Sequence, residues 1–384
     1  MNSTTAYCLL NTDFPFPSYF IMHLIDTFRD PDLARRLIAE IHNLAHRPLA
    51  FMEFCGGHTH AIMQHGIRQL MPENVRLLSG PGCPVCVTSQ RDIDYAIALS
   101  QLPDVVIATF GDMVRVPGTS FTLQEAAAAG SHVRILYSPL DAVRYAQEHP
   151  EKQVIFLGVG FETTAPGVAA SILQARALAL SNYTIFSMHK YTPPGMHAIL
   201  NAGEVRLHGI IGPGHVSAII GLDGWQFLPE QYAMPVVVAG FEPVDILLAL
   251  RNLVELAISG QARALNAYNR SVVPQGNPAA LKIMNQVFET TDADWRGFGF
   301  IPQSGMGIRP EFQEYDAAVR FALPDVPSRE PPGCRCGDVL RGVIEPPACP
   351  LYGKACTPQR PKGPCMVSDE GACSAYYLYQ TPVE

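Results

Sequence analysis

The amino-acid sequence predicts an α/β protein with two similar parallel-sheet domains and a cysteine- and proline-rich region at the C-terminus. Two observations support this prediction. Between about residues 48 and 258, short apolar runs alternate with segments of helical pattern, which is typical of parallel sheets covered by helices. After Leu323, prolines become so frequent that long helices are excluded, and six of the ten cysteines of the 384-residue chain lie there.

The apolar runs define eight candidate strands, with helices expected between them. One helix is well bounded: Leu123–Ala129 follows Thr122, which forms a capping box with Glu125. Gly130 supplies the C-terminal stop of this helix. The candidate strands are Ala50–Phe54, Val75–Leu78, Val105–Phe110, Val133–Tyr137, Val154–Gly158, Thr184–Ser187, Gly209–Ile211 and Val236–Ala239.

A weak internal repeat divides this region into two halves. Ser79–Cys83 (SGPGC) and Ile211–His215 (IGPGH) each place a Gly-Pro-Gly turn directly after a candidate strand. Chance recurrence is the competing explanation, because the chain contains 31 glycines and 33 prolines. We expect an N-terminal helical segment over residues 1–47, α/β domains over 48–145 and 146–258, a mostly helical connection over 259–330 and the cysteine-rich region over 331–384.

Composition and charge exclude several classes of function. The chain is 48% hydrophobic and has a formal net charge of −8, which suits packed domains and disfavours general binding to nucleic acid or anionic membranes. No apolar run approaches the ~20 residues that span a bilayer. The segment Met1–Leu10 also lacks the basic start and apolar stretch of a signal peptide. We therefore expect a soluble, cytoplasmic protein.

The cysteines of the C-terminal region indicate a metal or redox centre. A proline-rich segment with little apolar surface gains order when its thiolates bind a metal or a cluster. No histidine follows His215, so this region alone cannot form a mixed Cys/His zinc site. The spacing of the cysteines supports a four-cysteine zinc site almost as well as an iron–sulfur cluster. In either case, two of the six thiols remain for a disulfide or dithiol. These cysteines are Cys334, Cys336, Cys349, Cys356, Cys365 and Cys373.

Cys83 and Cys86 form a CxxC pair where a strand is expected to meet a helix. The N–H groups of a helix start favour the thiolate, so this position is expected to lower the pKa of the first thiol. Pro84 suits the first helical turn, where its missing N–H costs little. Two buried structural cysteines are the alternative, but such pairs seldom have this glycine and proline frame. The motif therefore predicts redox or metal chemistry.

Cys55 and His58 lie in a Gly- and His-rich segment at the end of another candidate strand. Ligands gather at the carboxyl ends of parallel strands, where this thiol and imidazole can converge. One thiolate and one imidazole suit Fe²⁺ and leave coordination positions open. Each histidine of this segment, taken alone, would instead be a surface or helix-cap residue; His60 is expected to face elsewhere.

Two further loops point to the same edge. One contains Glu162 and Thr164, and the other contains His215 and Ser217. Thr164 and Ser217 are most simply interpreted as helix caps. Glu162 and His215 can position a ligand or move a proton, although each signal is weak alone. No GxxxxGK[ST] motif occurs, which disfavours nucleotide hydrolysis.

Read together, these segments resemble the motif set of the HypD family of hydrogenase maturation factors. The arrangement of the six C-terminal cysteines also matches, so the resemblance runs from about Phe51 to Cys373, nearly the whole chain. Residues before about position 20, including Cys8, match nothing in it. The four motifs are Phe54–His60 (FCGGHTH), Gly80–Cys86 (GPGCPVC), Gly160–Thr164 (GFETT) and Gly212–Ser217 (GPGHVS).

The resemblance implies a [4Fe–4S] cluster in the C-terminal region and an iron site in the first α/β domain. Cys55, with His58 beside it, is similar to the family's iron-binding cysteine. Cys83 and Cys86 are similar to a dithiol between iron and cluster, with iron ligation by this pair as the second interpretation. The implied cluster ligands are Cys334, Cys349, Cys356 and Cys373, and the implied accessory thiol pair is Cys336 and Cys365.

The function implied by the resemblance is maturation of [NiFe] hydrogenase. The chain would hold Fe²⁺, as the Fe(CN)₂CO precursor, together with a small HypC-type chaperone, and would accept cyanide from a HypE-type donor with electrons from the cluster. Two alternatives stay open. A zinc-stapled docking scaffold without redox chemistry predicts a colourless protein. A cluster-dependent thiol oxidoreductase of the ferredoxin–thioredoxin reductase kind predicts activity without Cys55 and His58.

Overall fold

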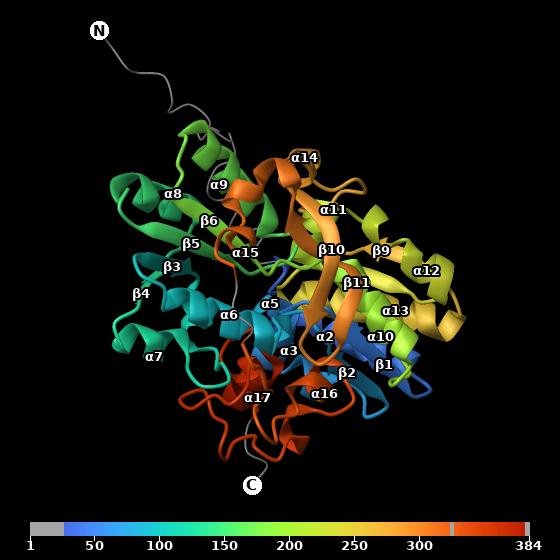
Figure 1. Cartoon of the computed structure of the whole chain (residues 1–384). Helices are drawn as coiled ribbons and strands as arrows, with labels where there is room; N and C mark the ends of the chain where they lie inside the picture. The colour runs from blue at the N-terminus through green and yellow to red at the C-terminus, as the bar shows by residue number, and fades with distance from the viewer. Residues whose placement is uncertain (1–26, 323–325, 381–384) are drawn as a thin grey trace.

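Two parallel sheets and one antiparallel hairpin organise this computed structural model, which describes residues 27–322 and 326–380 (Figure 1). The larger sheet has the strand order β2-β1-β7-β8-β9 and the smaller one the order β4-β3-β5-β6. The α/β class with parallel sheets is thereby confirmed. The larger sheet contains β1 (Leu49–Glu53), β2 (Val75–Ser79), β7 (Gly209–Pro213), β8 (Val236–Ala239) and β9 (Ala264–Asn266). The smaller contains β3 (Val105–Thr109), β4 (His132–Ile135), β5 (Gln153–Gly158) and β6 (Tyr183–Ser187).

The eight predicted strands are all present, with ends that differ by two residues at most. Their grouping differs from the expected division into residues 48–145 and 146–258. β1 and β2 pair with β7 and its neighbours, whereas β3 and β4 pair with β5 and β6, so each sheet combines strands from both ranges. In the register of β1 and β7, Phe51 lies beside Gly209. A Cβ atom at Gly209 would lie 3.0 Å from the Phe51 ring, so the absence of a side chain allows this long-range pairing.

The expectation of a mostly helical connection over residues 259–330 is wrong. Its main feature is the hairpin of β10 (Phe288–Trp295) and β11 (Gly299–Ile308). Gly297 and Gly299 have φ angles of 83° and 71°, and such left-handed residues permit a tight hairpin turn. A Cβ atom at Gly297 would lie 2.4 Å from the Cα atom of Gly337, so the hairpin turn packs directly against the C-terminal region.

Helices cover both sheets and connect their strands. In the N-terminal part, α2 (Pro31–Leu44) begins at Asp30, whose carboxylate accepts hydrogen bonds from two backbone N–H groups, and the predicted capping box of α7 (Leu123–Ala128) is present. Residues 1–26 of the expected N-terminal segment, including Cys8, lie outside the described residues. The other helices that precede the hairpin are α3 (Gly56–Gln64), α4 (Ile67–Leu70), α5 (Pro84–Val87), α6 (Gln90–Ser100), η1 (Gly111–Arg115), α8 (Pro139–Glu148), α9 (Ala165–Ala177), α10 (Thr192–Ala202), α11 (Gly214–Ile220), η2 (Asp223–Trp225), α12 (Phe227–Tyr232), α13 (Pro243–Ser259) and α14 (Pro278–Val287).

The C-terminal region forms short elements at one end of the molecule, drawn in red in Figure 1. Its last helix packs against α3, at the carboxyl end of β1. After the hairpin the chain forms η3 (Pro310–Tyr315), α15 (Ala317–Arg320), α16 (Cys336–Leu340), η4 (Pro346–Ala348), η5 (Pro364–Met366) and α17 (Ala372–Tyr379).

One hydrophobic core joins the two sheets. Met52 of β1, Ile155 of β5 and Trp295 of the hairpin are all buried in it, whereas Phe51 faces a separate core under α2 and α13. Both faces of β1 are therefore covered, which explains its continuous apolar run. Among the described residues, no helix has the length and apolarity that crossing a membrane requires.

Candidate metal and redox site

Cys55 lies where β1 ends and α3 begins. It is the residue that caps the helix, and its carbonyl oxygen accepts hydrogen bonds from the N–H groups of His58 and Thr59, at 2.9 and 3.1 Å. Its own N–H donates to the carboxylate of the buried Glu53 at 2.8 Å. Burial and the nearby carboxylates of Glu370 and Glu53 raise the pKa of the Cys55 thiol. A bound cation would therefore be needed to hold this thiol as a thiolate at neutral pH.

The CxxC segment contacts Cys55 through its glycine. The N–H of Gly56 donates to the carbonyl oxygen of Gly82 at 3.0 Å, and a Cβ atom at Gly82 would lie 2.2 Å from the backbone nitrogen of Cys55. Only glycine allows this approach of the two backbones. The Cys55 segment and the CxxC segment are thus in direct contact.

We expect Gly82→Ala to destabilise the protein by about 1–3 kcal/mol, because the added methyl group must displace the Cys55 backbone. Gly167→Ala in α9 is the matched control: its Cβ atom would make only an ordinary 3.8 Å contact with Pro139, and alanine in a helix is favourable by roughly 0.5–1 kcal/mol over glycine. Urea unfolding of both variants measures the difference. Equal stability of the two variants would contradict the close approach.

His58 is a fully buried neutral imidazole with one free nitrogen. Its Nε2 atom lies 2.9 Å from the carbonyl oxygen of Gly240 and 3.2 Å from that of Ala239, so Nε2 must bear the proton. Nδ1 is then an unprotonated acceptor, and it has no hydrogen-bond partner in the described part of the chain. Burial lowers the pKa of His58 to about 4, which keeps this lone pair available at neutral pH.

His215 does not share a hydrogen bond with His58. The ring of Phe241 stacks against both imidazoles, with centroid distances of 4.7 Å to His58 and 4.0 Å to His215. Burial lowers the pKa of His215, although this residue is less enclosed than His58. The two predicted histidines thus lie on one side of the site, and both stack against Phe241.

Cys83 and Cys86 occupy the start of α5, as predicted. The Sγ atom of Cys83 accepts a hydrogen bond from the Cys86 N–H at 3.3 Å. Burial and the neighbouring Cys86 thiol nevertheless raise the pKa of Cys83, so the expectation of a lowered pKa for the first thiol is wrong. Burial also acts to raise the pKa of Cys86, but contacts with the thiols of Cys365 and Cys83 and the charge of Arg296 outweigh it and lower that pKa. The second thiol is therefore the more acidic.

Cys365 connects the CxxC pair to the other C-terminal cysteines. Its thiol interacts with those of Cys336, Cys373 and Cys86, and these contacts together with burial raise its pKa. The Sγ atoms of Cys336 and Cys365 lie 2.7 Å apart. A continuous series of thiols thus leads from Cys83 through Cys86 and Cys365 into the C-terminal region.

All six C-terminal cysteines line one small cavity. The close Cys336–Cys365 pair leaves four thiols, and a Cβ atom at Gly363 would lie 2.7 Å from Sγ of Cys334, so the glycine keeps space open beside it. Burial, Cys336 and the nearby thiols of Cys373 and Cys349 raise the pKa of Cys334 to about 12. For these four thiols to become thiolates together, a positive centre would be needed between them, and a metal ion or an iron–sulfur cluster could supply it.

Glu370 belongs to the site although no sequence motif indicated it. A Cβ atom at Gly56 would lie 2.5 Å from Cβ of Glu370, which places this residue directly against the start of α3. Partial burial and then the nearby Cys86 and Asp112 raise the pKa of Glu370 to about 7, although part of the residue is exposed to solvent. Its proximity to Cys55 depends on the docking of the C-terminal region, which spacing in the sequence does not reveal.

His60 helps to dock the C-terminal region on α3. Its Nδ1 atom lies 3.2 Å from the carbonyl oxygen of Asp369, and its Nε2 atom lies 3.2 Å from the hydroxyl of Tyr379. The two histidines of α3 therefore have different surroundings: His58 is buried against the carbonyl groups of Ala239 and Gly240, and His60 contacts the segment that contains Glu370.

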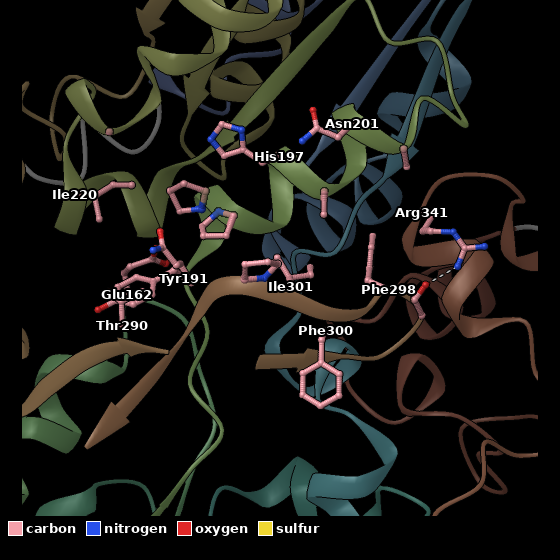
Figure 2. A pocket seen from close by; sticks show the side chains of 18 of the residues that line it. Glu162, Tyr191, His197, Asn201, Ile220, Thr290, Phe298, Phe300, Ile301 and Arg341 are labelled. Atoms are coloured by element: carbon pink, nitrogen blue, oxygen red, sulfur yellow. Dashed lines mark hydrogen bonds between the residues drawn. The ribbon is translucent and has the colours of Figure 1, made fainter. Parts of the chain in front are cut away.

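Glu162 has partners other than the thiols. Its carboxylate accepts hydrogen bonds from the N–H and Oγ1 of Thr192, both at 2.8 Å, at the start of α10. Burial raises its pKa to about 7. Glu162 also lines a cavity of about 1050 Å³. Figure 2 shows Glu162 at one end of this cavity, between α10 and the hairpin, with His197 and Phe300 on its walls. The contacts of Glu162 are thus with α10 and this cavity, and not with Cys55 or the CxxC pair.

The fold and the site define a cysteine-rich α/β protein whose buried thiols meet beside the larger sheet. Residues 32–380 match the family model HypD, described as the hydrogenase formation hypA family. The hydrogenase maturation factor HypD of Azotobacter vinelandii is 46% identical over 367 residues, which cover 93% of this chain and 97% of the relative. That of Cupriavidus necator is 43% identical over 369 residues, which cover 93% and 97%. The chain belongs to the HypD family, and the resemblance inferred from the motifs is confirmed.

Proposed function

We propose that this protein acts in the maturation of [NiFe] hydrogenases as the site where iron receives cyanide. Membership of the HypD family supports the general role. The observation that supports the chemistry is the series of thiols from Cys83 through Cys86 and Cys365 to the C-terminal cavity, beside Cys55. The nine cysteines of the described residues are all free thiols, which is consistent with work in the reducing cytoplasm.

Iron is the cargo in this proposal. Cys55 supplies a thiolate once Fe²⁺ replaces its proton, and the free Nδ1 lone pair of His58 supplies a neutral nitrogen donor. A small HypC-type chaperone completes the binding with a cysteine of its own. The remaining positions stay open for cyanide and carbon monoxide.

Cyanide transfer from a HypE-type donor requires reduction of a thiocyanate. Its S–C bond breaks when two electrons enter, which leaves a thiolate on the donor and a cyanide ion for iron. Oxidation of Cys83 and Cys86 to a disulfide supplies two electrons and releases two protons. Glu370 lies beside these thiols, and its pKa of about 7 allows it to accept one of the protons, while the thiolate left on the donor accepts the other.

Thiol–disulfide exchange then restores the CxxC pair. Cys365 attacks Sγ of Cys86, Cys83 leaves as a thiolate, and Cys336 attacks Cys365 to release Cys86, so that the disulfide moves to Cys336 and Cys365. A [4Fe–4S] cluster held by Cys334, Cys349, Cys356 and Cys373 would supply electrons, one at a time, to reduce this second disulfide.

Iron and sulfide analysis tests the cluster directly. We expect anaerobically purified protein to be brown, with about four iron and four acid-labile sulfide per chain. Cys356→Ser should lose the colour, whereas Cys55→Ser should keep it, because only the first of these thiols lines the cavity. One tightly bound zinc without sulfide would instead support the docking-scaffold alternative.

Iron ligation by Cys83 and Cys86 is the second candidate role for this pair. Contact between Gly82 and the Cys55 backbone favours it, because it holds the two motifs together. X-ray absorption spectroscopy on iron-loaded, partner-free protein separates the roles. Unchanged sulfur coordination in the Cys83→Ser/Cys86→Ser variant supports the relay, and loss of sulfur ligands supports ligation.

A further inference from the structure

The loop around the thiol cavity has the opposite charge to the rest of the chain. The protein has a net charge of −8, yet residues 346–368 contain no Asp or Glu and three basic residues. These are Lys354, Arg360 and Lys362, and all three are exposed. We call them the basic collar.

The basic collar lies on the outer wall of the cavity. Lys354 is in the turn that joins Tyr352 to Cys356, and its N–H donates to the carbonyl oxygen of Leu351 at 3.2 Å. The N–H of Lys362 donates to Sγ of Cys356 at 3.3 Å. Arg360 closes the next turn, where its N–H bonds to the carbonyl oxygen of Thr357. Leu351, Tyr352 and Cys356 themselves line the cavity.

The three charges of the collar are not neutralised within the described part of the chain. Nearby cations are paired: Arg335 and Arg341 bind Asp338, and Arg341 also binds Glu204. By contrast, the side chains of Lys354, Arg360 and Lys362 take part in no ion pair among residues 27–322 and 326–380. Unpaired surface charges of one sign attract a partner of the other sign and accelerate its association.

The thiols beneath the collar are close to the surface. Cys334 is only partly buried, and Cys349 and Cys356 retain 8% and 7% of their accessible surface. The CxxC pair is more deeply enclosed, at 3% for Cys83 and 0% for Cys86. An electron from outside the protein therefore meets the cavity thiols before it meets the CxxC pair.

We propose that the basic collar is the docking surface for an acidic one-electron carrier protein of the ferredoxin type. The proposal rests on the proposed function, in which the cavity holds a [4Fe–4S] cluster. In each encounter the reduced carrier loses one electron and the centre bound by the cavity thiols gains it, so two encounters supply one thiocyanate cleavage. Three unpaired cations suit the small, transient and salt-sensitive interfaces of electron-transfer partners.

The test compares two charge-reversal variants with the unmodified protein. One is Lys354→Glu/Arg360→Glu/Lys362→Glu, in the collar. The matched control, Arg36→Glu/Arg263→Glu/Lys282→Glu, changes the net charge equally at exposed positions of α2, the segment before β9 and α14. A milder Lys354→Gln/Arg360→Gln/Lys362→Gln variant serves if charge reversal impairs folding, which thermal unfolding detects.

A small acidic [2Fe–2S] ferredoxin is the probe. Stopped-flow absorbance at low ionic strength measures reduction of the protein by reduced ferredoxin, and calorimetry measures binding of oxidised ferredoxin. We expect the collar variant to be reduced at least ~10-fold more slowly, to bind more weakly and to lose most of the salt dependence of the rate. The control variant should behave like the unmodified protein.

Methyl viologen radical cation, a small reductant that needs no docking surface, should reduce all three proteins. Unchanged ferredoxin binding and reduction in the collar variant, or an equal loss in the control variant, would overturn the docking proposal. Absence of any reducible cluster in the unmodified protein would overturn the proposed function instead. In that case the calorimetric comparison still decides whether the collar binds the acidic carrier.

Discussion

Cys55→Ala should abolish hydrogenase maturation while leaving the C-terminal colour and the fold intact. The thiol of Cys55 is the one cysteine donor that the α3 start offers to iron, so its loss removes the cargo site. The backbone of Cys55 caps α3, but its side chain makes no capping hydrogen bond, so alanine should not disturb the helix. Hydrogenase activity in cells that lack their own copy measures the first effect, and visible absorbance of the purified variant measures the second.

His58→Ala is the graded comparison for this result. It removes a nitrogen donor that water or a partner can replace, so we expect weaker iron retention and only partial loss of maturation. Active hydrogenase in cells with the Cys55→Ala variant would show that the iron assignment is wrong. Loss of the colour in that variant would show that the two sites are not separate.

Cys365→Ser should block electron flow between the C-terminal cavity and the CxxC pair. Serine has nearly the shape of cysteine but cannot exchange disulfides, and Cys365 is the thiol that contacts both Cys86 and Cys336. After mild oxidation of Cys83 and Cys86, we expect a reduced cluster to restore these thiols in the unmodified protein. In the variant the recovery should slow by more than an order of magnitude, and maturation should fall accordingly.

Alkylation and mass spectrometry of the CxxC peptide measure this recovery. Cys55→Ala is the matched control, because it lacks the cargo thiol and retains the entire thiol series. Unimpaired recovery in the Cys365→Ser protein would contradict the relay and would favour iron ligation as the role of Cys83 and Cys86. Slow recovery in both variants would point to a general defect instead.

Local sequence signals predicted the elements of the fold well, but not their pairing. Each of the eight predicted strands is a short apolar run, and the capping box of α7 lies within a few residues, so both can be recognised from neighbouring positions. The largely polar strand β10 (FETTDADW) contains no such run and was missed. The partner of β1 depends on how Phe51 packs against Gly209, far along the chain. The internal repeat indicated similar strand–turn units and gave no information about which strands are neighbours.

The candidate site, too, was predicted where it depends on local motifs and missed where it depends on packing. Cys55, His58 and the CxxC pair were predicted because each motif is local and lies at a strand end. The acidity of Cys86 was not, because it depends on Cys365 and Arg296, which only the packed structure brings near it. Glu370 was missed for the same reason, and Glu162 was grouped with the thiols although it binds Thr192.

The order of strands in the larger sheet has a consequence for synthesis of the protein. β1 and β2 leave the ribosome early, but β1 cannot acquire its second neighbour until β7 has been made. The smaller sheet uses only β3 to β6, a continuous stretch, and can be completed while β1 still waits with one edge open. The cavity cysteines emerge last of all. A nascent chain therefore exposes one open edge of the apolar strand β1 from the synthesis of β2 until that of β7, and open edges of this kind are prone to aggregation.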